Sequence, residues 1–183
     1  MTLHEVLRVD LERQYFYEGV THKKPSTLRV WLRFFSPRFM PVVLYRLANA
    51  SHRSGLPSIA RLFSLVNFIV FGLEIAVRCD IGPGLFLPHT QGTVIGARRI
   101  GRNAVIYHNV TFGSREVDLD YSELSRPTIG DDVIVGAGAK VLGGIFIGDR
   151  ARIAANAVVI TDVPQGATAA GVPAKIVKLT DVF

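Results

Sequence analysis

Two histidines in the second half of this sequence, His89 and His108, are the side chains best suited to proton-transfer chemistry. A neutral imidazole accepts a proton near physiological pH, so either residue could act as a general base. A zinc site built from imidazoles needs about three converging histidines, and the region around these two contains no third one. We therefore expect no metal site. The alternative for each histidine is an ordinary position on the protein surface.

The elements that position these histidines are indicated by apolar residues spaced six apart. A six-residue period matches neither an α-helix nor a flat strand, and it is typical of a β-solenoid of stacked hexapeptides. Glycine or alanine follows most of these positions and suits tight corners. The strict positions are Ile129, Val135, Val141, Ile147, Ile153 and Val159.

The same period extends towards the N-terminus and is interrupted twice. It begins at Ile75 and gains one residue after Leu87. It then runs from Val94 to Phe112. Residues 113–128 do not follow it and are polar and acidic. Since insertions leave a solenoid on one side, we expect residues 113–128 to form an extruded loop.

Three hexapeptides can close one triangular turn of about eighteen residues, with neighbouring turns about 4.8 Å apart. An exposed solenoid end needs a cap, which we expect from the residues that precede the repeats. The flat outer faces favour association between copies of the chain. Inside the solenoid, this geometry stacks Ile129 on Ile147, Val135 on Ile153, and Val141 on Val159.

The chain is expected to have two domains. Residues 1–74 predict an N-terminal helical domain, and residues 75–183 predict the repeat domain, which includes the loop and ends in a C-terminal tail. Thr2 and Glu5 have the spacing of a helix capping box. Helices are expected over 3–15, 27–35, 41–47 and 58–71.

Composition and charge narrow the possible partners. The chain has 21 basic and 15 acidic residues, a net charge of +6, and most of the excess lies in residues 1–74. No basic stripe with interleaved aromatic residues is present, so nucleic acid is not an expected partner. An anionic membrane or an anionic cofactor fits the charge better. The one cysteine, Cys79, indicates a reducing compartment.

The cellular location expected from the sequence is the cytoplasm. Residues 1–10 carry charges and lack the apolar segment of a secretory signal. The longest apolar run, 62–73, is shorter than the roughly 20 residues that span a bilayer. It predicts a buried helix or, as the alternative, a helix on a membrane surface, which would place the protein peripherally at the inner membrane face.

Four stretches resemble the hexapeptide-repeat acyltransferases, and within them the serine acetyltransferases and their shorter relatives in surface-polysaccharide gene clusters. The resemblance implies a mainly β fold, a left-handed parallel β-helix behind N-terminal helices. It also implies O-acetyl transfer from acetyl-CoA without a metal, by a homotrimer or a dimer of trimers. The stretches are LPHTQGTVIG (87–96), VTFG (110–113), RPTIGDDVIVGAGAKVLGGIFIGDRARIAANAVV (126–159) and AAGVPAKIV (169–177).

The same resemblance implies a catalytic pair. His89 matches the general base that takes the proton of the acceptor hydroxyl. Glu74, in the stretch FGLEI (71–75), matches the carboxylate that orients the imidazole, where the family usually has Asp. Such a carboxylate fixes the imidazole tautomer and stabilises the imidazolium, and the spacing of Glu74 and His89 places them on adjacent coils. His108 is the competing candidate, expected to line the same cleft and contact the acceptor.

The resemblance further implies a coenzyme A groove between neighbouring subunits. In the family, the backbone of small residues lines this groove and a turn near the C-terminus completes it, with basic side chains at the phosphates. The alternative for the small residues is simple packing at the solenoid corners. The matching positions are Gly113, Ser114, Ala137, Ala155, Pro173 and Lys175, with Arg152 or Arg150 as a further phosphate contact.

The expected acceptor site departs from the serine acetyltransferase pattern. Pro88 stands where the family has an Asp that holds the ammonium group of serine, and Ser125 and Arg126 stand where it has an Arg-His pair for the carboxylate. Glu18 is the match for a third acceptor contact. Because a missing charge partner weakens binding of a zwitterion, these changes favour a sugar hydroxyl of a surface polysaccharide or its precursor. The alternatives are a serine O-acetyltransferase of cysteine biosynthesis and a non-catalytic solenoid for assembly or membrane docking.

Overall fold

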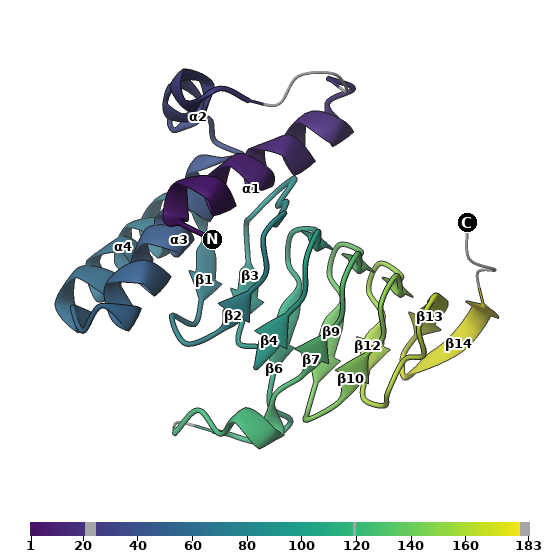
Figure 1. Cartoon of the computed structure of the whole chain (residues 1–183). Helices are drawn as coiled ribbons and strands as arrows, with labels where there is room; N and C mark the ends of the chain where they lie inside the picture. The colour runs from purple at the N-terminus through teal and green to yellow at the C-terminus, as the bar shows by residue number, and fades with distance from the viewer. Residues whose placement is uncertain (21–24, 119, 180–183) are drawn as a thin grey trace.

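A computed structural model describes residues 1–20, 25–118 and 120–179 of the 183-residue chain. Helices at the N-terminus cover one end of a three-sided parallel β-helix (Figure 1). The expected mainly β class, with a left-handed β-helix behind N-terminal helices, is confirmed. The helices are α1 (Leu3–Tyr17), α2 (Thr27–Arg33), α3 (Met40–Arg53) and α4 (Pro57–Phe71).

Local sequence explains where these helices begin and end. The predicted capping box at α1 is present, since Thr2 N–H donates to the Glu5 carboxylate at 2.7 Å and the Thr2 hydroxyl accepts from Glu5 N–H at 3.3 Å. At α2, the Ser26 hydroxyl serves as the N-cap and accepts from Arg29 N–H at 3.4 Å. Proline occupies the first turn of α3 and of α4, where no amide donor is needed. Gly72, with φ 59°, ends α4 in the left-handed conformation that glycine tolerates best.

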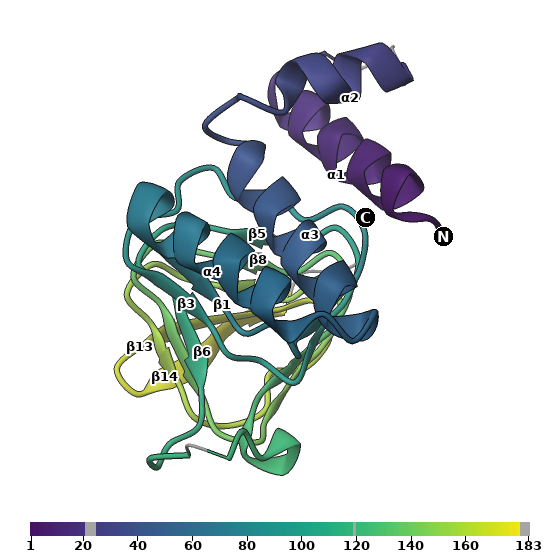
Figure 2. The same cartoon turned by 90° about the vertical axis from the view of Figure 1, so that its left-hand side faces the viewer.

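Three sheets form the sides of the β-helix, and Figure 2 shows them along the solenoid with α3 and α4 in front. The first sheet has the order β1-β3-β6-β9-β12: Leu73–Ile75, Thr93–Ile95, Thr111–Gly113, Lys140–Leu142 and Val158–Val159. The second has the order β2-β4-β7-β10: Asp80–Ile81, Arg99–Ile100, Thr128–Ile129 and Phe146–Ile147. The third has the order β5-β8-β11-β13-β14: Val105–Ile106, Ile134–Val135, Arg152–Ile153, Ala167–Gly171 and Ala174–Leu179.

The register of the parallel strands confirms the predicted stacking. The three expected pairs, from Ile129 on Ile147 to Val141 on Val159, are partners in neighbouring strands. All six side chains are at most 2% exposed, so these apolar columns form the core and supply most of the burial that stabilises the solenoid.

One detail of the predicted period is wrong. After the first interruption, the inward residue is Ile95, which is fully buried, whereas Val94 faces outward and is 37% exposed. Side chains alternate across a strand, and the pairing of β3 with β1 places Val94 beside Glu74 on the outer face. The next predicted inward residues, Ile100, Ile106 and Phe112, are buried as expected, so the error is confined to Val94.

The chain leaves the solenoid between β6 and β7, where the sequence predicted an extruded loop. This loop carries a short 3-10 helix, η1 (Glu123–Ser125), and projects from the lower edge of the solenoid in Figure 1. Residue 119, inside the loop, and residues 180–183, at the end of the expected tail, lie outside the described residues. The preceding part of the tail forms the antiparallel hairpin β13–β14.

Helix α4 is not the buried helix that its apolar sequence favoured. Its buried residues are Ala60 and Asn67, whereas Leu62, Leu65 and Phe68 are each more than half exposed. Its apolar character therefore reflects an exposed face rather than the core of the protomer. No helix among the described residues is long and apolar enough to cross a membrane.

Candidate active site

His89 and His108 lie next to each other where consecutive coils turn from the third sheet to the first. Phe86 bridges to Val105 of the third sheet, and the first sheet resumes at Thr93. The two imidazole rings meet edge to face, with centroids 5.7 Å apart. Both side chains are exposed, and neither hydrogen bonds to a described residue. We call this place the histidine corner.

Glu74 lies on β1, below the coil that carries His89. Thr90, the residue after His89, donates its hydroxyl proton to the carbonyl of Phe71 at 2.8 Å, so the histidine corner packs on the segment that leads into β1. The Glu74 side chain faces outward and is exposed. It forms no hydrogen bond or ion pair with any described residue, His89 included. The orienting role of Glu74 therefore stays a prediction.

Ala137 and Ala155, two of the predicted cofactor positions, lie on the same corner in later coils. The N–H of Gly138 donates to the carbonyl of His108 at 3.0 Å, and the N–H of Asn156 donates to the carbonyl of Ala137 at 2.8 Å. These bonds stack the corners of three successive coils, which carry His108, Ala137 and Asn156, into one column. Ala155 is exposed and Ala137 is half-buried, so backbone of small residues is accessible along the column.

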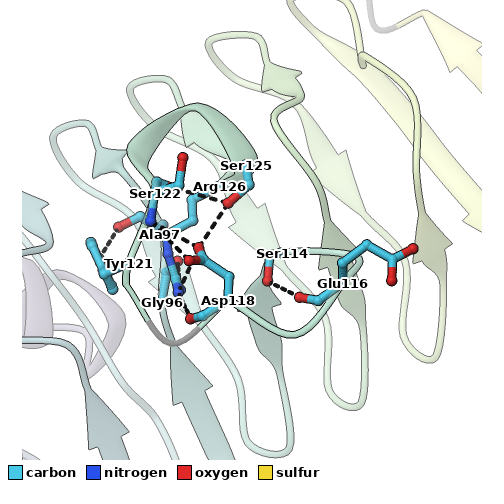
Figure 3. Close-up of polar contacts among 9 residues, drawn as sticks. All are labelled: Gly96, Ala97, Ser114, Glu116, Asp118, Tyr121, Ser122, Ser125 and Arg126. Carbon is cyan, nitrogen blue, oxygen red and sulfur yellow. Dashed lines mark hydrogen bonds and ion pairs between the residues drawn. The ribbon is translucent and has the colours of Figure 1, made fainter.

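Arg126 holds the extruded loop against the first sheet (Figure 3). Its guanidinium lies 3.1 Å from the Asp118 carboxylate and donates to the carbonyl of Gly96 at 3.1 Å. It also lies 3.8 Å from the ring centroid of Tyr121, whose hydroxyl donates to the carbonyl of Ala97. The Arg126 side chain is only 11% exposed. Within one protomer this cation anchors the loop, and its predicted contact with the acceptor stays a prediction.

Asp118 is the second half of this anchor. Its carboxylate accepts hydrogen bonds from Ser122 N–H at 2.9 Å and from the Ser125 hydroxyl at 2.8 Å. The backbone bond from Ser122, the hydroxyl of Ser125 and the charge of Arg126 lower the pKa of Asp118 below its usual range. Polar contacts around one carboxylate therefore organise the loop.

The loop and the histidine corner lie at opposite edges of the first sheet. The chain crosses that sheet between His89 and Gly96, and Gly96 contacts Arg126. Strand β3 separates the two places, and no hydrogen bond, ion pair or ring contact joins His89 to Arg126 in the described structure. Gly113 and Ser114, at the end of β6, also lie at the loop edge. Arg126, Gly113 and Ser114 thus lie at a different corner of the solenoid from His89 and His108.

Glu18, predicted as an acceptor contact, lies just after α1. Its carboxylate is already paired with one amide and two guanidinium groups. It accepts a hydrogen bond from Gln14 at 2.7 Å and lies 3.5 Å from Arg33 and 4.0 Å from Arg38. Its neighbour Tyr17 stacks on Phe86, three residues before His89 along the chain. The helix end therefore approaches the side of the solenoid that leads to the histidine corner.

The remaining predicted phosphate contacts lie on the third sheet. Arg152 is exposed on the outer face of β11, and Lys175 is exposed on β14. Pro173 is exposed in the turn that joins β13 to β14. In the described part of the chain, no group of three or more His, Cys, Asp or Glu side chains is arranged to hold a metal ion.

The sequence expectations did not include two structural ion pairs. Asp10 and Arg46 form a buried pair between α1 and α3, and Asp118 pairs with Arg126 in the loop. A signal for the first existed, because Asp10 lies on the apolar face of α1 with Leu7 and Leu11 on either side, and a charge on such a face requires a partner. No comparable signal marks Asp118, because it lies in an irregular polar stretch.

Known proteins match this chain over nearly its full length. A family model described as bacterial transferase hexapeptide (six repeats) matches residues 126–161. A serine acetyltransferase of Helicobacter pylori is 41% identical over 169 residues, which are 91% of this chain and 97% of that protein.

Solved structures agree with these matches. The crystal structure of a Neisseria gonorrhoeae serine acetyltransferase in complex with serine has a TM-score of 0.79 and 31% identity, and the match covers 94% of this chain and 68% of that one. A Brucella abortus serine acetyltransferase in complex with coenzyme A has a TM-score of 0.81 and 30% identity, over 98% of this chain and 69% of that one.

The helix-capped parallel β-helix and the match to the hexapeptide model place the chain in the class of hexapeptide transferases. The chain belongs to the hexapeptide-repeat transferase family, in its serine acetyltransferase branch, and is an O-acetyltransferase.

The acceptor expected from the sequence is therefore corrected. The expectation of a sugar hydroxyl is wrong, since the relatives that match almost the whole chain are serine acetyltransferases, the stated alternative. The non-catalytic solenoid is wrong for the same reason. The expectation failed because it equated the loss of two side chains, at Pro88 and Ser125, with the loss of serine recognition. Other groups in an assembled site can hold an ammonium or a carboxylate group, and sequence alone does not show which of them are near.

Proposed function

We propose that this protein is a serine O-acetyltransferase, which transfers the acetyl group of acetyl-CoA to the hydroxyl of L-serine. The observation that carries the proposal is the exposed His89 beside His108 on neighbouring coils. The chain that holds them matches 97% of the length of a Helicobacter pylori serine acetyltransferase. The serine and coenzyme A complexes of the structural relatives support the choice of substrates.

The proposed chemistry uses His89 as general base. Its imidazole takes the hydroxyl proton of serine as the oxygen attacks the thioester carbonyl. The tetrahedral intermediate expels the coenzyme A thiolate, and the imidazolium returns the proton to that thiolate. Free coenzyme A and O-acetyl-L-serine result. Glu74 is the proposed orienting carboxylate, since it is exposed and unpartnered among the described residues and lies on the strand below the His89 coil.

We propose that the coenzyme A groove forms between two copies of the chain in a homotrimer. The separation of the histidine corner from the loop by the length of β3 supports this arrangement, because the loop of a neighbouring copy can approach a corner that this protomer's own loop does not contact. The exposed apolar residues of α4 also support association, since isolated protomers rarely expose such a face. Gly113 fits a cofactor contact, because a side-chain carbon there would meet no atom within 4 Å and packing does not require glycine.

Among the proposed acceptor contacts, His108 is the one whose side chain has no hydrogen bond or ion pair to a described residue. Glu18 and Arg126 are paired within the protomer, whereas the His108 ring meets the His89 ring edge to face. We propose that His108 positions the acceptor for His89.

Product analysis tests the proposal. The protein is incubated with acetyl-CoA and either L-serine or N-acetylglucosamine, and products are identified by mass spectrometry. We expect O-acetyl-L-serine with release of coenzyme A, and a mass in solution near three times 20.1 kDa. Coenzyme A release without acetylated serine would overturn the proposal.

A further inference from the structure

A second cleft lies at the junction of the helices and the solenoid, away from the histidine corner. It has a volume of about 480 Å³ and is bounded by α1, α3 and the first two coils of the second sheet. The turns that line it join the second sheet to the third, whereas the histidine corner joins the third sheet to the first. The residues used below to assign a ligand are Arg46, Arg53, Asp80, Arg99 and Arg102.

Two of the four arginines in this cleft are already neutralised. Arg46 pairs with the buried Asp10 at 2.9 Å, and its remaining N–H groups donate to the carbonyls of Ile81 and Gly82. Arg53 lies 2.7 Å from Asp80. That pair is exposed, so it contributes little to stability and can be exchanged for another partner.

Arg99 and Arg102 have guanidinium groups without a partner among the described residues. Both side chains are exposed, Arg99 on the outer face of β4 and Arg102 in the turn that follows. The Asp131 carboxylate accepts the backbone N–H of Arg102 at 2.7 Å and forms no ion pair with either guanidinium group. Among the described residues, Asp80 is the sole acidic one that lines the cleft.

We propose that this cleft binds a tetrahedral dianion, such as sulfate or a phosphate ester, between Arg99 and Arg102. Two unpaired guanidinium groups match two negative charges, and the planar fork of each suits adjacent oxygens of such an anion. Arg53 supplies a third cation once the anion competes with Asp80. Apolar residues of the α1 and α3 walls accommodate the organic part of an ester.

Because the cleft connects the helices to the first coils, a bound dianion would tie the two parts of the molecule together. Binding to the folded state alone raises stability by mass action. The proposal is independent of the acceptor, so it is tested without acetyl-CoA or serine.

The test is thermal unfolding and calorimetry of the whole protein with sulfate, inorganic phosphate or phenyl phosphate, at constant ionic strength set with potassium chloride. We expect a saturable rise in Tm and a measurable Kd. Tightest binding of phenyl phosphate would identify an ester as the ligand class, and tightest binding of sulfate would identify the inorganic anion. Absence of saturation with all three probes would overturn the proposal.

Three variants assign the effect to the cleft. The double variant Arg99→Gln/Arg102→Gln should raise Kd at least about tenfold, because both charge-assisted pairs are removed. Asp80→Asn should lower Kd several-fold, because it frees Arg53. The control Arg61→Gln, at an exposed arginine on α4, should leave Kd unchanged. Equal affinity in the double variant and the unmodified protein would also overturn the proposal. Acetyl transfer without added anion should be unchanged in all three.

Discussion

Asp10 on α1 and Arg46 on α3 form a bidentate ion pair that ties the helices to the first coil of the solenoid. The two side chains are 0% and 7% exposed, with N–O distances of 2.9 and 3.0 Å. The carboxylate also accepts the backbone N–H groups of Gly84 and Leu85, at 2.7 and 2.9 Å. Since every group of the pair has a partner, two buried charges are tolerated at the place where helices and solenoid meet.

Removal of one half of this pair should destabilise the protein. Asp10→Ala leaves the buried Arg46 guanidinium without its counter-ion and two backbone amides without an acceptor, so we expect a loss of about 3–5 kcal/mol in the free energy of unfolding. Denaturant titration measures it. The control Glu12→Ala, which removes an exposed pair with Arg8 on the same helix, should change stability by less than about 1 kcal/mol. A loss below about 1 kcal/mol for Asp10→Ala would contradict the role assigned to this pair.

The extruded loop should depend on the shape of Arg126 as well as its charge. Arg126→Lys keeps the cation but loses the fork that reaches Asp118 and Gly96 together. We expect faster amide hydrogen exchange in residues 114–127 in this variant, and a raised KM for serine if the neighbouring copy uses the loop as proposed. Unchanged exchange in the loop would show that Arg126 does not anchor it.

The loop should also loosen in acid. Hydrogen bonds from Ser122 and Ser125, with the charge of Arg126, lower the pKa of Asp118 in the folded state. A group whose pKa is lowered by folding stabilises the fold above its unfolded pKa, and that contribution is lost as the pH falls through the folded pKa. The contribution should be complete above about pH 5 and decline below about pH 4. Exchange of the Ser122 amide, followed against Asp118→Asn, measures this. A pH profile identical in the variant would refute the assignment.

Cys79 should report global unfolding. The thiol is 0% exposed, and burial raises its pKa to about 12. The thiol therefore stays protonated and inaccessible at pH 8. The rate of its reaction with a thiol reagent should be limited by the rate of protein unfolding. Since the chain has one cysteine, each molecule gives one signal. Rapid labelling of the native protein at low denaturant would contradict the buried position.

The solenoid could be predicted because its signal is repeated. The columns that include Ile129 and Ile147 follow from spacing alone, since each coil presents the same short-range pattern. The start of α1 followed from the capping-box spacing of Thr2 and Glu5. The one wrong inward position in the solenoid is Val94. It lies just after an insertion, and the neighbouring residue Ile95 faces inward instead.

The site was predicted less completely because its contacts are long-range. The motif around His89 marked the histidine corner, and the neighbouring position of His108 followed from the coil repeat. The partners of Arg126 and Glu18 depend on how a loop and a helix end fold back, which local spacing does not encode. The acceptor was missed for a related reason. Pro88 and Ser125 show which family contacts to serine are absent, but they do not show which other groups lie near the acceptor.

The central claim is that His89 activates the hydroxyl of serine. The most direct measurement compares serine-dependent release of coenzyme A from acetyl-CoA by the unmodified protein, His89→Ala and His108→Ala, with circular dichroism to confirm folding. General-base catalysis contributes about 10²–10⁴-fold, so we predict a loss of that size in kcat for His89→Ala and a mainly KM-based loss for His108→Ala. A folded His89→Ala protein that acetylates serine at the unmodified rate would contradict the account.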